Sequence, residues 1–570
     1  MLLKYRKIKF PLFISLCCLA LNVSADSIEW QLCDADVGVD SNYDCSTFKV
    51  PLDHKNSASV GENAYIGLEL IRFKATDQDN KKGTIFLNPG GPGGSGFDFL
   101  RSVGPYLFTD RVREKYDLVG FDPRGIGRSE QLRCFASQEE VQIVQSIPAF
   151  PKNDEEVAIH QLVDEGISEL CMLRASDIID YMSTADVARD LDLMRKAVGD
   201  EKLHYAGYSY GTYLGVVYAN LFPENVGSMI LDAVVDPIAW SRGRGNQAEY
   251  LPFSSRIKSA KGADASLQEF FRTCEEGGPE QCAIAGDAEA RFNRLMDSLY
   301  DSPIQLVVND EVIVIDYAAA VSFTTSTLYN PFDWPLLAQV IADFDAFTNP
   351  ELAAQNYLIM MEALEGAADK NTLDTSEGAP VDQPGLGFSG VACADSDNPA
   401  WYESWAFAAF YDELRFGLLA PSWTWISSIC HSWPGSQQSR YQGKFKTRTA
   451  TPVLVVNTLF DPATPYHGAK RVNRLLKGSR LITVNGWGHG SLGNSQCLDQ
   501  AEEAYLLHGV LPRKGTVCDQ DITPFGASLP LSSYTSDVPG IVKPRKTKAQ
   551  RTALREARRK ALREMRKKRK

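Results

Sequence analysis

Short apolar runs alternate with helical patterns along most of the chain. The runs consist of β-branched and other apolar side chains, each ends in a glycine-rich or polar turn, and they cover residues 84–88, 116–121, 203–206, 229–231, 452–456 and 481–484. After the third run, apolar residues recur at helical spacing until Pro223 ends the segment; they are Leu214, Val217, Tyr218 and Leu221. Strands that alternate with helices predict an α/β fold, with a mainly parallel sheet covered by helices on both faces.

The alternation breaks between residues 237 and 441. Toward its end this stretch gathers large aromatic side chains, namely Trp401, Trp405, Phe407, Phe410, Trp423, Trp425 and Trp433. Such side chains more often form a core than line a pocket. We therefore expect residues 237–441 to form an inserted, largely helical cap, and the sheet domain to consist of two parts, residues 26–236 and 442–530.

Residues 1–25 have the pattern of a secretory signal. A basic start with Lys4, Arg6, Lys7 and Lys9 leads into an apolar stretch and then into the small residues of a cleavage site. A membrane anchor is the alternative, but the apolar stretch is shorter than the roughly 20 residues that span a bilayer, and it contains Pro11. We expect an exported protein that is periplasmic, associated with the cell envelope or secreted.

The cysteines outside this signal favour disulfides. They are Cys33, Cys45, Cys134, Cys171, Cys274, Cys282, Cys393, Cys430, Cys497 and Cys518. An even number in an exported chain argues for disulfides rather than metal ligands. The sequence does not fix which cysteines pair, and we expect neighbours to pair in order, which gives five short bridges. The sequence contains no CxxC pair and no HExxH motif, so a zinc mechanism has no support. We expect neither a metal nor an organic cofactor.

Charge is distributed unevenly along the chain. From Lys543 to Lys570, 15 Lys and Arg stand against two Glu, so the formal net charge of −13 leaves −26 on residues 1–542. Without the four positive side chains of the signal, the body carries −30. We do not expect a body this acidic to bind nucleic acid. The basic tail, residues 531–570, is expected to be disordered or helical and to contact an anionic envelope surface.

The sequence Gly-Tyr-Ser-Tyr-Gly at residues 207–211 matches the nucleophile elbow G-x-S-x-G. In this motif the serine sits at a sharp turn between a strand and a helix, and its hydroxyl points out of the sheet. The motif alone is weak, but here an apolar run stands directly before it and a helical pattern directly after it. Ser209 is therefore the candidate nucleophile.

A serine hydroxyl needs a base within hydrogen-bonding reach, and a carboxylate must hold that base in the right tautomer. Folds with this elbow place the acid and then the histidine after the nucleophile along the chain. Asp461 and His489 each follow one of the late apolar runs in that order. Among the seven histidines, His489 is favoured because glycines flank it, and His431 and His467 are minor rivals.

A glycine-rich loop at residues 88–96 follows the first apolar run, where this fold places half of its oxyanion hole. Glycines let backbone N–H groups approach the developing negative charge. We assign Gly91 as one donor and Tyr210, which follows the nucleophile, as the other. A phosphate-binding loop is the competing interpretation, but no Lys-Ser/Thr follows and the glycine spacing is not that of a dinucleotide fingerprint.

Four segments in order carry a resemblance to a known family. They are the Gly-Gly-Pro-Gly loop, the turn at residues 122–129 (Asp-Pro-Arg-Gly-Ile-Gly-Arg-Ser), the Gly-Tyr-Ser-Tyr-Gly elbow and the late Asp and His loops. Together they resemble the prolyl aminopeptidase family of α/β-hydrolases, most closely its secreted tripeptidyl aminopeptidase branch, over roughly residues 30–525. Prolyl aminopeptidases typically begin the glycine loop with histidine. This chain has Pro89 there, which argues against strict proline specificity.

The resemblance implies a serine exopeptidase that cleaves short peptides from free N-termini through an acyl-enzyme. Its substrates would be peptides, and carboxylates in or under the cap would bind the N-terminal ammonium. An exported carboxylesterase or lipase is the alternative, because the same triad cleaves esters. A non-catalytic binding protein on the same fold is a weaker alternative, because such proteins usually lose a triad member and this chain keeps Ser209, Asp461 and His489.

Overall fold

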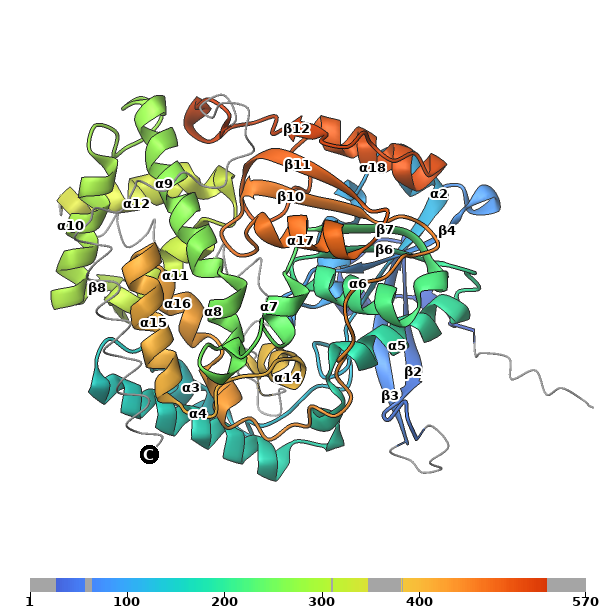
Figure 1. Ribbon diagram of the computed structural model, residues 1–570, viewed down its shortest axis with the longest axis horizontal. Coiled ribbons are helices and arrows are strands. Elements are labelled where there is room, and N and C mark those ends of the chain that lie inside the picture. The colour runs from blue at the N-terminus through green and yellow to red at the C-terminus, as the bar shows by residue number, and fades with distance from the viewer. Residues whose placement is uncertain (1–26, 57–63, 309–310, 347–380, 382, 531–570) are drawn as a thin grey trace, which may run out of the picture.

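The computed structural model describes residues 27–56, 64–308, 311–346, 381 and 383–530 (Figure 1). The predicted signal at residues 1–25 and the predicted basic tail at residues 531–570 lie outside these residues. Within the described part, no helix is both long enough and apolar enough to cross a bilayer.

A mainly parallel sheet runs through the described part of the molecule (Figure 1). Its strand order is β1-β2-β3-β5-β4-β6-β7-β10-β11-β12, and every neighbouring pair from β5 to β12 is parallel. The strands are β1 (Gln31–Leu32), β2 (Tyr43–Pro51), β3 (Tyr65–Phe73), β4 (Gly83–Asn88), β5 (Tyr116–Phe121), β6 (Leu203–Tyr208), β7 (Val226–Asp232), β10 (Leu454–Phe460), β11 (Arg480–Trp487) and β12 (Val517–Asp519). The six predicted runs are β4, β5, β6, β7, β10 and β11, which confirms the predicted α/β class. The antiparallel edge of β1, β2 and β3 was not predicted.

Helices cover both faces of this sheet, as predicted. Apolar side chains of α1, α2 and α18 pack on one face, and those of α5, α6 and α17 pack on the other. The helices of the sheet domain are α1 (Gly96–Val103), α2 (Asp110–Lys115), α3 (Gln138–Gln145), α4 (Asp154–Arg174), α5 (Thr184–Ala197), α6 (Tyr210–Leu221), α17 (His467–Leu475) and α18 (Gln496–His508). Several begin at polar caps: the Ser183 hydroxyl accepts from the third backbone N–H of α5, and the Asn153 side chain does the same for α4.

Between β7 and β10 the described chain is mostly helical, with one hairpin. Its elements are α7 (Pro237–Ser241), α8 (Phe253–Ile257), α9 (Ser259–Gly277), α10 (Ala288–Asp301), β8 (Ile304–Val308), β9 (Glu311–Ile315), α11 (Tyr317–Thr327), α12 (Trp334–Ala346), α14 (Leu386–Asp395), α15 (Glu403–Phe416) and α16 (Ala420–Trp425). Most of them surround a second apolar core that contains Phe270, Trp334 and Trp405, whereas α7, α8 and α14 pack into the core of the sheet domain. We call these elements the helical layer (Figure 1). Of the aromatics named above, Trp405 and Trp425 are core residues, whereas Trp401 is half exposed.

Five disulfides each join two consecutive cysteines of the chain, as predicted. The pairs are Cys33–Cys45, Cys134–Cys171, Cys274–Cys282, Cys393–Cys430 and Cys497–Cys518. Each bridge closes a short stretch of chain, so each fixes local structure: the last one, for example, holds the start of α18 to β12. In the chain-entropy account, closing a loop stabilises the fold by restricting the unfolded state.

Candidate active site

Ser209 occupies the turn between β6 and α6. Its backbone has φ 55° and ψ −125°, a conformation that non-glycine residues rarely adopt. The turn is tight on both sides. A Cβ atom at Gly207 would lie 2.4 Å from the carbonyl oxygen of Gly211, and one at Gly211 would lie 2.5 Å from that of Asn88. Only glycine fits at these two positions, so the G-x-S-x-G spacing follows from backbone contact.

The glycine-rich loop lies directly on this turn. A Cβ atom at Gly90 would lie 2.6 Å from the carbonyl oxygen of Tyr208 and 2.8 Å from the backbone nitrogen of Tyr210. The backbone of the loop at Gly90 therefore lies so close to the first N–H of α6 that no side chain fits between them. Gly91 follows in the loop, and within the described part of the chain its N–H makes no hydrogen bond. The residue before Gly91 thus contacts the backbone on both sides of Ser209.

Asp461 and His489 meet through a short hydrogen bond. The Nδ1 atom of His489 lies 2.9 Å from Oδ1 and 3.1 Å from Oδ2 of Asp461. The carboxylate is fully buried, while 11% of the imidazole side chain is exposed. Because Nδ1 faces the carboxylate, Nε2 is the nitrogen left for a second partner.

The remaining partners of the Asp461 carboxylate are all neutral donors. Its Oδ1 accepts from the backbone N–H of Ala463 at 2.9 Å and of Thr464 at 2.7 Å, and its Oδ2 accepts from the Thr464 hydroxyl at 2.8 Å. No lysine or arginine within the described residues pairs with it. The carboxylate is therefore held in place by hydrogen bonds while its negative charge faces the imidazole.

Parallel pairing of β10 and β11 brings these two side chains together. Asp461 directly follows β10, and His489 comes two residues after β11. The two strand ends are tied by cross-links, because the Thr458 hydroxyl donates to the carbonyl of Gly488 at 2.6 Å and the N–H of Gly488 donates to the carbonyl of Phe460 at 3.0 Å. Adjacent parallel strands end at the same edge of the sheet, which is where this class of fold places its functional groups.

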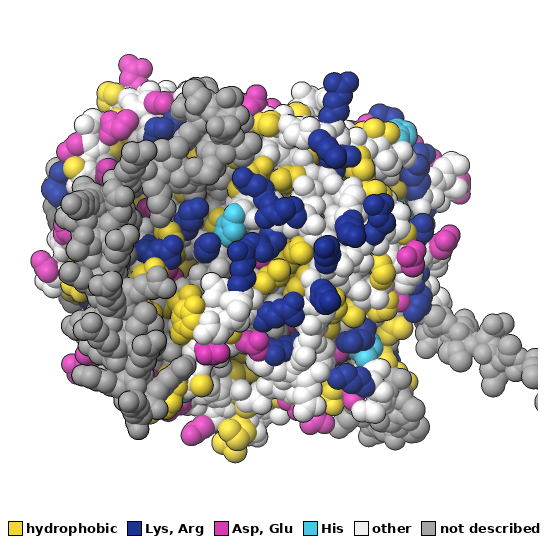
Figure 2. All heavy atoms as spheres, in the orientation of Figure 1, with side chains coloured by type: hydrophobic (Ala, Val, Ile, Leu, Met, Phe, Trp, Pro, Cys, Tyr) yellow, Lys and Arg dark blue, Asp and Glu magenta, His cyan; other side chains and the backbone are white. Residues whose placement is uncertain are grey.

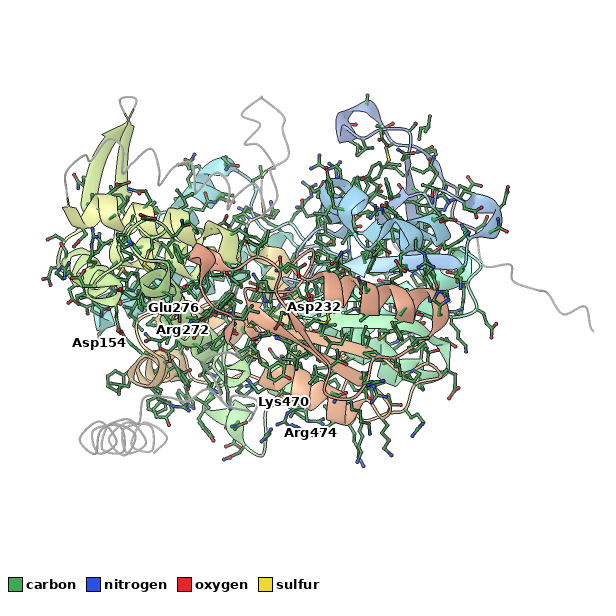
Figure 3. All side chains as sticks on the ribbon, turned by 90° about the horizontal axis from the view of Figure 1, so that it is seen from above. Asp154, Asp232, Arg272, Glu276, Lys470 and Arg474 are labelled. Carbon is green, nitrogen blue, oxygen red and sulfur yellow. A yellow bond between two sulfur atoms is a disulfide. The ribbon has the colours of Figure 1, made fainter. Side chains whose placement is uncertain are left out.

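Asp232, at the end of β7, joins the serine turn to the histidine loop. Its carbonyl accepts from the N–H of Ser209 at 3.1 Å, and its Oδ2 accepts from the N–H and the hydroxyl of Ser491 at 2.8 and 2.7 Å. The side chain lies near the centre of the molecule (Figure 3) and is buried, which raises its pKa. Ser209 and His489 are thus linked through Asp232, and no hydrogen bond joins the two side chains directly among the described residues. In the sequence, Asp232 was recognised only as the end of a strand.

The helical layer also holds the histidine. The backbone carbonyl of Tyr329 accepts from the N–H of His489 at 2.8 Å. The phenol ring of Tyr329 and the imidazole meet edge-on, with ring centroids 4.7 Å apart. Trp423 stacks on the other side of Tyr329, with centroids 6.3 Å apart. No sequence motif marks Tyr329, because its contact with His489 spans 160 residues of chain.

Helix α9 contacts the loop of Asp461 and the strand before His489 from the helical layer. A Cβ atom at Gly262 would lie 2.5 Å from the carbonyl oxygen of Asp461, so this helix packs against the acid loop with no room for a side chain. Further along α9, the buried carboxylate of Glu269 accepts from the indole N–H of Trp487 at 2.8 Å. Trp487 lies two residues before His489, so α9 contacts the acid loop and the histidine strand at once.

The rival histidines have no such partners. The Nδ1 atom of His431 is buried without a hydrogen bond, and His467 lines a small pocket beside Pro465 and Gly468. His54 does bind a buried carboxylate, that of Asp190, but far along the chain from the elbow. Within the described part of the chain, no group of three His, Cys, Asp or Glu could hold a metal ion.

Two family models match the chain. Residues 83–261, which include the glycine-rich loop and Ser209, match the model described as the alpha/beta hydrolase fold. Residues 417–518, which include Asp461 and His489, match the model described as TAP-like protein.

Curated relatives are similar over most of the chain. The tripeptidyl aminopeptidase of Streptomyces lividans is 29% identical over 89% of this chain and 89% of its own length. The serine protease Hip1 of Mycobacterium tuberculosis is 29% identical over 86% and 91%, and the carboxylesterase B of the same species is 28% identical over 87% and 91%. With a parallel sheet, an elbow between β6 and α6 and two family models that match, the chain is an α/β-hydrolase whose late strands form a TAP-like segment.

Proposed function

We propose that the protein is a serine peptidase that releases short peptides from the free N-termini of its substrates. The observation that carries this proposal is the 2.9 Å contact between His489 and Asp461, on a loop that Asp232 ties to the turn of Ser209. A base oriented by a buried carboxylate, beside a serine at a strained strand-to-helix turn, is what acyl transfer by a serine requires.

In this mechanism Ser209 is the nucleophile. The Nε2 atom of His489 takes the proton of the Ser209 hydroxyl while the hydroxyl oxygen attacks the peptide carbonyl carbon. The imidazolium then gives this proton to the leaving amine as the C–N bond breaks, which leaves an acyl-enzyme. Water, deprotonated by the same imidazole, attacks the ester and regenerates the serine hydroxyl.

Asp461 stabilises the imidazolium and fixes the tautomer of His489. Because its other partners are neutral donors, no positive charge competes with the imidazolium for the carboxylate. The tetrahedral intermediate carries a negative oxygen, and the N–H groups of Gly91 and Tyr210 are our assignment for its oxyanion hole. The close approach of Gly90 to the backbone of Tyr210 supports this assignment.

The names of the relatives support peptides as substrates. A tripeptidyl aminopeptidase and a serine protease are both 29% identical to this chain. Release of three residues at a time, or of one, would depend on how much room the helical layer leaves on the acyl side. A carboxylesterase is the second candidate function, because a relative with that name is 28% identical over similar lengths.

The experiment that separates these functions compares substrates on one enzyme. Rates are measured with a tripeptidyl arylamide, the same arylamide with an acetylated N-terminus, an aminoacyl arylamide and a short acyl ester. The proposal expects the free tripeptide substrate to be cleaved fastest and the acetylated one slowest. Cleavage of the ester alone would leave the carboxylesterase function.

A fluorophosphonate probe tests the nucleophile itself. The probe reacts with an activated serine hydroxyl, so we expect labelling of the wild type and none of Ser209→Ala. Ser95→Ala is the matched control, because this serine lies within the glycine-rich loop but its hydroxyl donates to Asp122 at 2.6 Å. Labelling that persists in Ser209→Ala would show that another side chain is the nucleophile.

We further propose that the protein is exported. Five disulfides in the described part of the chain support this, because such bonds persist in oxidising compartments. Removal of residues 1–25 and contact of the tail, residues 531–570, with an anionic envelope surface complete the proposal. Sequencing the N-terminus of the protein recovered from an expressing host tests the cleavage, and a start at residue 1 would contradict it.

A further inference from the structure

Lysine and arginine side chains gather on one broad face of the molecule. Figure 2 shows them around a histidine at the centre of the view, and Figure 1 places α17 there. The residues of this basic face come from the loop after α7, from the start of α9 and the residue before it, from α17 and the turn after it, and from the segment before β10; they are Arg244, Lys258, Lys261, Lys444, Lys446, Arg448, Lys470, Arg471, Arg474 and Lys477. In Figure 3 the side chains of Lys470 and Arg474 point away from the sheet on this side.

Three segments distant in sequence form this face. In α17, His467, Lys470, Arg471 and Arg474 follow the i, i+3, i+4, i+7 spacing of one helix surface, while Ala469 and Val472 are buried on the other. The N–H of Lys477 donates to the carbonyl of Thr447 at 2.8 Å, which brings the segment of Lys446 and Arg448 to the end of α17.

The start of α9 reaches α17 from the other side. A Cβ atom at Gly262 would lie 2.9 Å from the ring of Pro465, and Ile257 lines the same small pocket as His467. Lys258 and Lys261 lie between Ile257 and Gly262 in the chain. These two lysines therefore lie next to the first turn of α17.

Most charges of this face have no counter-ion. Lys258, Lys261, Lys470 and Arg474 form no ion pair with any described residue, whereas Arg471 pairs with the buried Asp236 at 2.9 Å. Burial first, and then the neighbouring positive charges, lower the pKa values of Lys258 and Lys261. The same causes lower the pKa of His467 to about 3. Like charges held this close repel one another, so an anion on this face would relieve the repulsion.

The rest of the chain makes this arrangement unusual. Residues 26–542 carry a net charge of −30, yet this face presents ten Lys and Arg. A protein this acidic is repelled by an anionic surface in most orientations, and a basic face selects the one orientation in which it is attracted.

We propose that the basic face docks the protein on a membrane surface that carries anionic phospholipid headgroups. Along α17 alone, Lys470 and Arg474 stand about 6 Å apart along the helix axis, and the other two segments widen the face, so the charges extend over more than one phosphate group. The face is the broad side of the molecule, since the view of Figure 2 runs along the shortest axis. A planar array of phosphates can meet all of these side chains at once, and its attraction falls within a Debye length.

The side chains of the basic face take no part in the proposed reaction. The charged surface of α17 faces outward, and its apolar surface packs on the sheet that carries the loops of Asp461 and His489. The inference is independent of the proposed function, because it uses no residue of the reaction.

The test measures binding of the full chain to sedimented vesicles. One set contains phosphatidylglycerol and phosphatidylcholine in equal parts, and the other contains phosphatidylcholine alone. Lys470→Glu/Arg474→Glu is compared with Arg513→Glu/Lys514→Glu, which makes the same change in net charge in the exposed loop after α18, on the other side of the sheet. Soluble inorganic polyphosphate is added as a competitor in a third set.

We expect Lys470→Glu/Arg474→Glu to weaken binding to the anionic vesicles about tenfold or more relative to the control variant. We also expect Lys470→Gln/Arg474→Gln to weaken it less, and all binding to fall with added salt. Activity in solution should remain that of the wild type, which verifies folding. Equal binding of the two charge-reversed variants would overturn the proposal, as would loss of polyphosphate binding with vesicle binding unchanged.

Discussion

The pairs His54–Asp190 and His489–Asp461 are both short and both buried, but they differ in what else holds the aspartate. His54 Nε2 lies 2.7 Å from Asp190, and the guanidinium of Arg124 also binds this carboxylate with two hydrogen bonds of 2.7 Å. Asp461 has only neutral donors besides its histidine.

The difference decides what each aspartate can do. Arg124 neutralises Asp190 and also donates to the carbonyls of Pro51, Leu52 and Tyr181, so this pair fastens the end of β2 to α5. Among the described residues, the imidazole is the one partner of Asp461 that can carry a positive charge. The same two residue types thus form a structural ion cluster at one site and a proposed catalytic pair at the other, and the number of positive partners distinguishes them.

Replacing each histidine by alanine should give the largest contrast. We expect His489→Ala to lower kcat for a tripeptidyl arylamide about a million-fold, because the serine loses its base. His54→Ala should leave kcat per folded molecule near that of the wild type. Active protein is counted by folded fraction in both variants. A large loss of kcat in His54→Ala would erase the distinction between the two pairs.

Replacing each aspartate by asparagine should also lower kcat at one site and leave it unchanged at the other. Asp461→Asn should lower kcat about ten-thousand-fold, because an amide stabilises neither the imidazolium nor the required tautomer. Asp190→Asn should leave kcat of the folded enzyme unchanged. The measurement is steady-state kinetics with the same arylamide, and equal kcat values for Asp461→Asn and the wild type would remove Asp461 from the mechanism.

Removing Arg124 should break the structural pair. We expect Arg124→Ala to lower the free energy of unfolding by about 3–5 kcal/mol, because Asp190 would remain as a buried and uncompensated charge. Arg111→Ala is the control: this arginine also pairs with a carboxylate, that of Glu503, but its side chain is 64% exposed, so we expect a change below about 1 kcal/mol. Both values come from denaturant unfolding, and similar losses in the two variants would contradict the prediction.

The smallest expected effect concerns pH. Burial raises the pKa of Asp190, but the charge of Arg124 and the bond to His54 outweigh it, and the pKa is lowered overall. A carboxyl with a lowered pKa stabilises the fold above its unfolded pKa of about 4, and this contribution is lost as pH falls through the folded value. The stability gap between the wild type and Asp190→Asn should therefore be widest near neutral pH and shrink in acid. Denaturant unfolding at several pH values measures it, and a gap that widens in acid would reverse the sign.

Local sequence signals were sufficient where function depends on neighbouring residues. The elbow could be recognised at Ser209 because Gly207 and Gly211 touch backbone within a few residues or on the adjacent strand. Six of the seven parallel strands followed from apolar runs, and β12 was not predicted. Tyr329, Glu269 and Asp232 could not be found this way, because each acts through a contact between residues far apart in the chain.

The sequence by itself determined the class of fold and the candidates Ser209, Asp461 and His489, because periodicity, glycine spacing and chain order can be recognised from residues close together in the chain. Only the tertiary structure decided that Asp190 binds Arg124 as well as a histidine, whereas Asp461 binds a histidine and neutral donors, and that basic residues of an acidic chain share one face. Electrostatics depends on distance in space and on burial, and neither is fixed by position along the chain.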